Sequence, residues 1–151
     1  MEAICGPMGC VGVTDQRSVA HLLTGRLIES DAFMNLNISE MKVYVPAKDL
    51  GVSKAFYGAL GFEVAEAWGG NADCRLGAAV FRLQDYYVKD WAHNFMMQFD
   101  VDDARAWYEH AKAAIAGGDF GDARVKEPEM HDGALITHVW DPAGVLLIFI
   151  E

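Results

Sequence analysis

The chain has few cysteines, little positive charge and no long apolar run, and each shortage excludes a class of protein. The 3 cysteines (Cys5, Cys10 and Cys74) are an odd number and form no Cys-X-X-Cys pair, which disfavours a disulfide framework and a structural zinc site. Only 12 Lys and Arg stand against 22 Asp and Glu, and a net charge of −10 repels a phosphate backbone. The longest apolar runs, such as Val145–Ile150, are too short to cross a bilayer. We therefore expect neither nucleic acid nor a membrane as a partner.

The start of the chain differs from the rest. No basic segment followed by an apolar stretch opens it, so we expect no secretory signal and a cytoplasmic protein. Residues 1–33 form a predicted N-terminal extension, in which the apolar spacing of Gln16–Ser30 predicts one amphipathic helix. Whether that helix covers a sheet edge or packs on a partner subunit stays open. Residues 34–151 are predicted to form a single domain, with modules at about 40–92 and 93–151.

Two stretches of the chain repeat one pattern. Met41–Phe62 reads as a strand, an Asp and a helix, and Met96–Gly117 reads the same way. The aromatic pair Phe56–Tyr57 in the first stretch corresponds to Trp107–Tyr108 in the second. Because such a repeat indicates two copies of one supersecondary unit around a shared core, we expect a cleft between them where a ligand would bind.

Each copy is predicted to be a βαβββ module, which gives an α+β fold. We expect strands at 41–47, 62–67, 72–76 and 78–87 with a helix at about 49–60, then strands at 95–101, 123–127, 134–140 and 145–150 with a helix at 103–116. Strand alternation directs Val43, Val45, Met97 and Phe99 towards the helices. It leaves a mixed lining on the opposite face, made by Lys42, Tyr44, Arg82, Gln84, Met96 and Gln98.

Three motifs resemble the vicinal oxygen chelate superfamily, which includes glyoxalase I, extradiol dioxygenases and bleomycin-resistance proteins. They are V-P-A-K-D-L-x-x-S-x-x-F-Y-x-x-L-G-F at Val45–Phe62, V-D-D-A-x-x-W-Y at Val101–Tyr108 and D-P-A-G-V-L-L at Asp141–Leu147. The resemblance covers roughly residues 40–151. It implies paired βαβββ modules that form a curled mixed sheet around a cleft, often in a dimer.

The resemblance also locates the positions that bind metal in the metal-dependent members. These positions correspond here to Lys42, Arg82, Met96 and Ile148, which supply two cations, a thioether and no carboxylate or imidazole. The chain is therefore similar to the metal-free branch typified by bleomycin-resistance proteins, which bind a cationic ligand and perform no chemistry. We expect no cofactor and no catalytic residue.

We hypothesise that the protein binds or sequesters a small organic molecule, cationic or aromatic, in the cleft between modules of a homodimer. The predicted ligand-binding residues are Lys42, Tyr44, Arg82, Gln84, Trp91, Met96, Gln98 and Ile148. An arginine on a concave sheet needs an anionic partner, and we expect Arg82 to pair with either Asp100 or a carboxylate of the ligand. Two alternatives stay open: a metal-dependent lyase, isomerase or dioxygenase with a displaced metal site, and a protein-interaction module.

Overall fold

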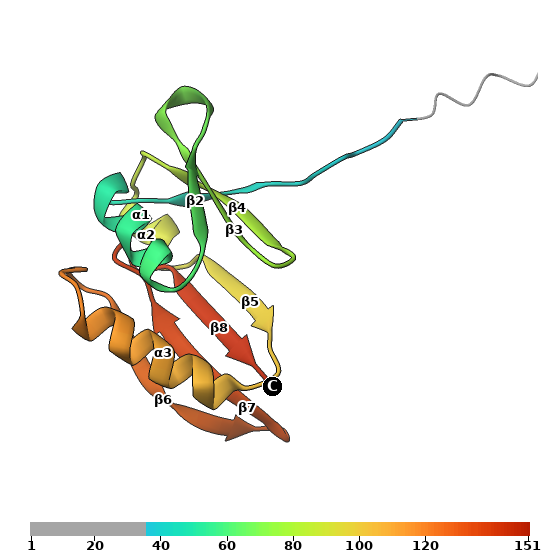
Figure 1. Cartoon of the computed structure of the whole chain (residues 1–151), viewed down its shortest axis with the longest axis vertical. Helices are drawn as coiled ribbons and strands as arrows, with labels where there is room; N and C mark the ends of the chain where they lie inside the picture. Colours follow the sequence, from blue (N-terminus) through green and yellow to red (C-terminus); the bar gives the residue numbers. More distant parts are fainter. Residues whose placement is uncertain (1–35) are drawn as a thin grey trace, which may run out of the picture. The chain divides into compact units, whose positions relative to one another are not determined.

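The two repeats fold into two βαβββ modules (Figure 1). This computed structural model describes residues 36–151, and the helix expected within Gln16–Ser30 lies outside them. Contacts group Ile38–Glu151 into one compact unit. The predicted α+β class with paired modules is confirmed.

The first module forms a four-stranded sheet, sheet A, with the strand order β1-β4-β3-β2. Its elements are β1 (Val43–Pro46), α1 (Leu50–Ala59), β2 (Glu63–Glu66), β3 (Ala72–Leu76) and β4 (Ala79–Gln84), with a short 3₁₀ turn, η1 (Trp68–Gly70), before β3. Strand β1 pairs parallel to β4, and the other pairs are antiparallel. A short helix that the sequence pattern did not predict, α2 (Lys89–Ala92), leads to the second module.

The second module repeats this order in sheet B, β5-β8-β7-β6. Its elements are β5 (Met96–Asp100), α3 (Ala104–Ala116), β6 (Arg124–His131), β7 (Ala134–Trp140) and β8 (Leu146–Ile150). Strand β6 runs past its predicted end at residue 127, because a shift in its register against β7 between Lys126 and Glu129 lets the pairing continue to His131.

An aspartate starts each of the two longer helices. The Asp49 carboxylate accepts a hydrogen bond from the Val52 N–H at 2.9 Å, and the Asp103 carboxylate accepts one from the Ala106 N–H at 2.7 Å. Such caps satisfy an N–H that has no partner within the helix. Of the two adjacent aspartates Asp102 and Asp103, the second is the cap of α3.

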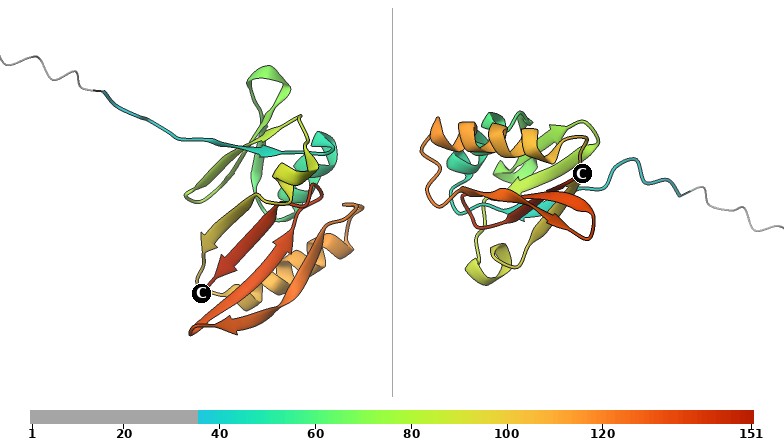
Figure 2. Two further views of the ribbon diagram at one scale, coloured as in Figure 1. Left: turned by 180° about the vertical axis from the view of Figure 1, so that it is seen from behind. Right: turned by 90° about the horizontal axis from the view of Figure 1, so that it is seen from below.

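Each sheet has one face covered by helices and one face that we call its open face. Helices α1 and α3 lie next to each other on the same side of the sheets (Figure 2). The side chains between them and the sheets form the core, which includes Phe56, Phe81, Leu83, Leu147 and Phe149. The alternation that directs these residues inward leaves every second strand residue on the open faces.

A buried hydrogen bond joins the modules. The Tyr57 hydroxyl of α1 donates to Asp141 Oδ2 at 3.0 Å, and both side chains are fully buried. The other Asp141 oxygen accepts from the N–H groups of Ala143 and Val145, each at 2.8 Å, in the turn between β7 and β8. Two motifs of the sequence, the Phe-Tyr pair and the Asp-Pro-Ala-Gly turn, therefore meet at this contact and hold the fold together.

Candidate functional site

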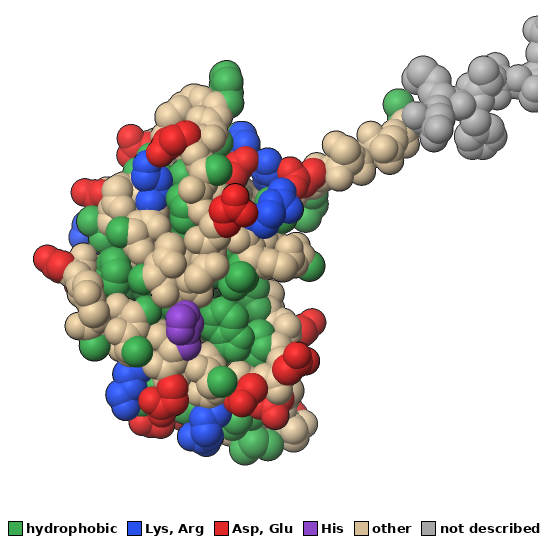
Figure 3. Space-filling view, in the orientation of Figure 1, with side chains coloured by type: hydrophobic (Ala, Val, Ile, Leu, Met, Phe, Trp, Pro, Cys, Tyr) green, Lys and Arg blue, Asp and Glu red, His purple; other side chains and the backbone are tan. Residues whose placement is uncertain are grey.

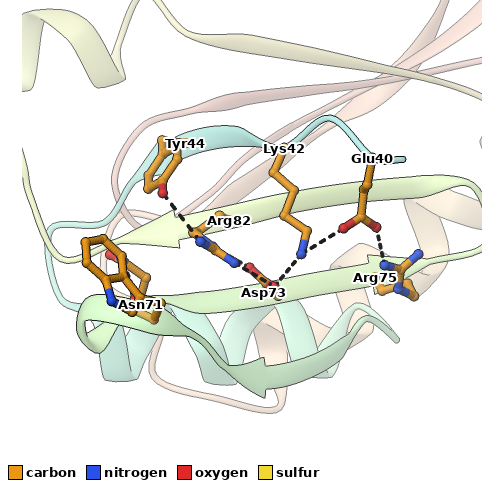
Figure 4. A network of polar contacts seen from close by, with 8 residues as sticks. Glu40, Lys42, Tyr44, Asn71, Asp73, Arg75 and Arg82 are labelled. Carbon is orange, nitrogen blue, oxygen red and sulfur yellow. Dashed lines mark hydrogen bonds and ion pairs between the residues drawn. The ribbon is translucent and has the colours of Figure 1, made fainter. Parts of the chain in front are cut away.

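The open face of sheet A carries a network of charged side chains (Figure 4). Tyr44, Arg82 and Asp73 lie opposite one another on β1, β4 and β3, so their side chains share one face. Arg82 donates from Nε to Asp73 Oδ1 at 2.6 Å and from Nη2 to Oδ2 at 3.0 Å. Lys42 Nζ lies 2.7 Å from Asp73 Oδ2 and 2.8 Å from Glu40 Oε2. One carboxylate thus bridges two cations.

This network shifts the pKa values of its members in the directions that ion pairing requires. Hydrogen bonds from Arg82 and then Lys42 lower the pKa of Asp73 to about 2. Hydrogen bonds to Asp73 and Glu40 raise the pKa of Lys42. At neutral pH all four groups carry their full charges, and the two-point contact fixes the guanidinium plane of Arg82.

The carboxylate within the chain that pairs with Arg82 is Asp73, not Asp100, which was one of the two partners proposed from the sequence. Asp100 lies on β5 of the other sheet and accepts a hydrogen bond from Gln98 Nε2 at 2.9 Å. Strand alternation alone did not identify Asp73, because its position opposite Arg82 depends on the register of β3 against β4. The turn at Gly77 and Ala78 places Leu76 opposite Ala79, and counting back along both strands then places Asp73 opposite Arg82. The Gly77–Ala78 turn is therefore the feature of the sequence that predicts the pairing of Asp73 with Arg82.

The open face of sheet B is more apolar and has two well-defined cross-strand rows. In the first row Met96, Leu146, Trp140 and Arg124 lie opposite one another on β5, β8, β7 and β6, and in the second the order is Gln98, Ile148, His138 and Lys126. The guanidinium carbon of Arg124 lies 4.2 Å from the centre of the Trp140 ring. Sequence analysis singled out Met96, Gln98 and Ile148 but missed the β6 and β7 members of these rows.

The eight predicted ligand-binding residues occupy three places. Lys42, Tyr44, Arg82 and Gln84 are on or next to sheet A, Met96, Gln98 and Ile148 are on sheet B, and Trp91 is in α2. Tyr44 is 44% exposed and Trp91 is 66% exposed. The Trp91 ring lies 6.3 Å from that of Tyr86. No hydrogen bond or ion pair found within residues 36–151 connects the sheet A set to the sheet B set.

A groove lies between the modules, and we call it the inter-module groove. It consists of two hollows of about 550 and 510 Å³, which share Ala78, Ala79, Gln98 and Phe99. Figure 3 shows hydrophobic side chains gathered between the modules next to α3. In the larger hollow the rings of Trp107 and Phe149 stack with centroids 4.4 Å apart. Of the eight predicted residues, Gln98 is the one that lines this groove.

Buried and half-buried side chains depart from the predicted alternation at one place. Val45 is buried as predicted, but Val43 remains 39% exposed. It lines the smaller hollow of the inter-module groove at β1, which is the edge strand of sheet A.

The single described cysteine, Cys74, is a buried free thiol, and burial raises its pKa to about 12, so it stays protonated at neutral pH.

A comparison with protein families decides the classification of the chain. Residues 39–149 match the family described as the Glyoxalase/Bleomycin resistance protein/Dioxygenase superfamily. The chain belongs to this superfamily. No curated protein sequence matches it.

Solved structures support the superfamily fold. A bleomycin-binding protein complexed with bleomycin is 24% identical, with a TM-score of 0.61 over 76% of this chain and 98% of that one. A bleomycin resistance determinant encoded on the transposon Tn5 is 23% identical, with a TM-score of 0.62 over 76% and 98%. The bleomycin-binding protein from Streptomyces verticillus, complexed with copper(II)-bleomycin, is 20% identical, with a TM-score of 0.60 over 75% and 97%.

The superfamily includes metal-dependent enzymes, and the side chains at the corresponding positions decide whether a metal fits this member. The resemblance matches Lys42 and Arg82 to two of the family's metal positions, and the structure pairs both cations with Asp73. It matches Met96 and Ile148 to the other two, and their side chains offer no oxygen or nitrogen donor. In the part of the chain that the structure describes, no three His, Cys, Asp or Glu side chains are grouped to hold a metal ion. These residues do not fit the superfamily's metal.

Among residues 36–151, no helix has the length and hydropathy needed to cross a bilayer.

Proposed function

We propose that the protein binds a small organic molecule without a metal, in a cleft to which the open faces of its two modules contribute. The observation that carries this proposal is the identity of the residues at the positions that bind metal in the metal-dependent members of the family. By the resemblance, two of them hold Lys42 and Arg82, which are both ion-paired with Asp73, and the other two hold Met96 and Ile148. Besides these charged side chains, the two faces present aromatic, apolar and amide groups, which suit an organic ligand better than a metal ion.

The chemistry of the two faces suits an amphipathic organic ligand. Tyr44 and Met96 are 44% and 61% exposed, so an aromatic face and a polarisable thioether are free to contact a ligand. Gln98 and Gln84 add amide donors and acceptors. The three structural neighbours described above carry bleomycin in their names, which makes bleomycin the first probe to use. The net charge of −10 favours cationic probes in the same series.

The test is a binding titration of the purified, chelator-treated full chain, followed by calorimetry or intrinsic fluorescence well below the melting temperature. We expect saturable binding of one probe and no effect of added manganese, nickel, cobalt or zinc. Replacing Tyr44 or Met96 with Ala should lower affinity at least tenfold, about 1.4 kcal/mol, because each removes a direct contact. Arg82→Ala should have a similar effect.

Matched control variants show whether a loss of affinity comes from a lost ligand contact or from a general effect of the substitution. Met130 is 66% exposed, close to the 61% of Met96, and Arg105 is an exposed arginine on α3. Met130→Ala and Arg105→Ala should therefore leave the affinity unchanged. Equal affinities in all variants would refute the assignment of the binding residues. A saturable rise in melting temperature with one metal, abolished by chelator, would instead support the metal-dependent alternative.

A further inference from the structure

A second hollow, distinct from the inter-module groove, lies at the turn between β7 and β8. Its volume is about 330 Å³. Its lining comes from several connections of the chain and consists of Lys48, Tyr87, His93, Asp122, Arg124, Pro142, Ala143 and Gly144. An adjoining hollow of about 190 Å³ shares His93, Arg124 and Gly144 with it and adds Trp140. We call the two together the turn hollow.

The turn hollow is cationic on a chain that is strongly acidic. Lys48 and Arg124 supply two positive charges and Asp122 one negative charge, so the lining carries +1 with His93 neutral. The whole chain carries −10. Lys48 Nζ and Asp122 Oδ2 are 3.9 Å apart, beyond hydrogen-bond distance, and both side chains are largely exposed. The lysine is therefore only weakly neutralised.

Arg124 keeps its hydrogen-bond donors available. Its guanidinium packs over the Trp140 ring, 4.2 Å from the centroid, which fixes the plane of the group. Within the described range 36–151 no carboxylate lies within ion-pair distance of it. Arg82, by contrast, donates two hydrogen bonds to Asp73. A guanidinium that is oriented by an aromatic ring and has no carboxylate partner is suited to two-point binding of an oxyanion.

A glycine packs against a third polar side chain of the hollow, that of His93. The imidazole of His93 packs directly on Gly144, whose φ is +92°. A Cβ at position 144 would lie 2.4 Å from His93 Cδ2 and 2.6 Å from Nε2. Any larger residue would therefore displace the imidazole from the lining. His93 lines both parts of the turn hollow, next to Arg124.

We propose that the turn hollow binds an oxyanion group, a phosphate or a carboxylate of a small molecule. Arg124 makes the two-point contact, Lys48 supplies a second positive charge, and His93 donates an imidazole N–H. The hollow lies at the end of the cross-strand row that begins at Met96, so it adjoins the open face of sheet B. This inference does not require the proposed function, because none of the eight predicted ligand-binding residues lines the turn hollow.

The probe is inorganic phosphate, titrated into the full chain at constant ionic strength and followed by amide chemical shifts in NMR. We expect saturable shifts at residues around the β7–β8 turn. Arg124→Gln and Lys48→Gln should each weaken binding about tenfold. Asp122→Asn should strengthen it about threefold, because it removes the one carboxylate of the lining. The melting temperature of each variant shows whether it remains folded.

The controls are an arginine and an aspartate outside the hollow. Arg105→Gln and Asp119→Asn change the net charge by the same amounts and should leave the phosphate affinity unchanged. If they alter it as much as the hollow variants do, binding follows overall charge and the proposal is overturned. It is also overturned if folded Arg124→Gln binds phosphate like the native chain. A parallel titration with acetate shows whether the hollow prefers a phosphate or a carboxylate group, because a carboxylate site binds acetate at least as tightly as phosphate.

Discussion

Asp73 is the residue on which the open face of sheet A depends. It accepts hydrogen bonds from Arg82 and Lys42, and these lower its pKa to about 2 from an ordinary value of 3.8. A carboxyl group whose pKa is lower in the folded chain than in the unfolded chain stabilises the fold above the unfolded pKa. That stabilisation is lost as the pH falls from about 4 through 2.

Asp73→Asn should therefore destabilise the protein at pH 7 and have much less effect at pH 2.5. The expected loss at neutral pH is about 1 kcal/mol, since the pair is partly exposed and one neutral amide replaces a bridging carboxylate. Urea unfolding of both proteins at the two pH values measures the difference. Asp119→Asn, which removes an exposed aspartate, is the control. An equal difference at both pH values would show that the ion pairs do not account for the effect.

At the scale of the elements, the turn between β7 and β8 is built around a buried carboxylate. Burial raises the pKa of Asp141 to about 6, although N–H groups of Val145 and Ala143 and the Tyr57 hydroxyl donate to it and act in the opposite direction. The protonated form is thus favoured in the fold relative to the unfolded chain, where the pKa is about 3.8. The stabilisation that the protonated Asp141 carboxyl provides is complete below the pKa of this group in the unfolded chain, and it is lost as the pH rises through 6.

Asp141→Asn removes this titration and keeps the shape of the group. The amide oxygen can accept from the two N–H groups of the turn, and its NH₂ can donate to the Tyr57 oxygen. Between pH 4.5 and 7.5 the native protein should lose about 2 kcal/mol relative to the variant. Urea unfolding at these two pH values tests this. Parallel stability curves for the two proteins would mean that Asp141 keeps an ordinary pKa.

The elements themselves were predictable where local signals agree. Asp49 and the Asp102–Asp103 pair precede apolar patterns of helical period, and alternating runs predicted the strands within a few residues. Helix α2 was missed because four residues are too short to show a period. The pairing of Arg82 with Asp73 was missed for another reason. It depends on the register between β3 and β4, which follows from the turn that joins them.

At the scale of the whole molecule, each module presents its own open face. Within residues 36–151, no hydrogen bond or ion pair joins the predicted binding residues of sheet A to those of sheet B. Sequence predicted which residues belong to each face, because alternation along a strand is local. It did not predict how two faces combine, since that depends on packing between distant parts of the chain or between chains.

We expect the native chain to be a homodimer in which the open faces of two copies complete each other. Strand β1 is an edge of sheet A, and the residues before it include the exposed apolar side chains Ile38 and Met41, at 85% and 75%. An edge strand flanked by exposed apolar residues favours association with another chain.

Sedimentation velocity should therefore give twice the 16.6 kDa mass of one chain at micromolar concentration. Met41→Asp should shift the protein towards the monomer, because a buried charge would be left unpaired in the interface. Met130→Asp places the same charge on another exposed methionine, on β6, and should leave the dimer intact. If binding requires both faces, the Met41→Asp monomer should also lose affinity for the organic probe. A native monomer that binds the probe would contradict the dimer while leaving small-molecule binding in place.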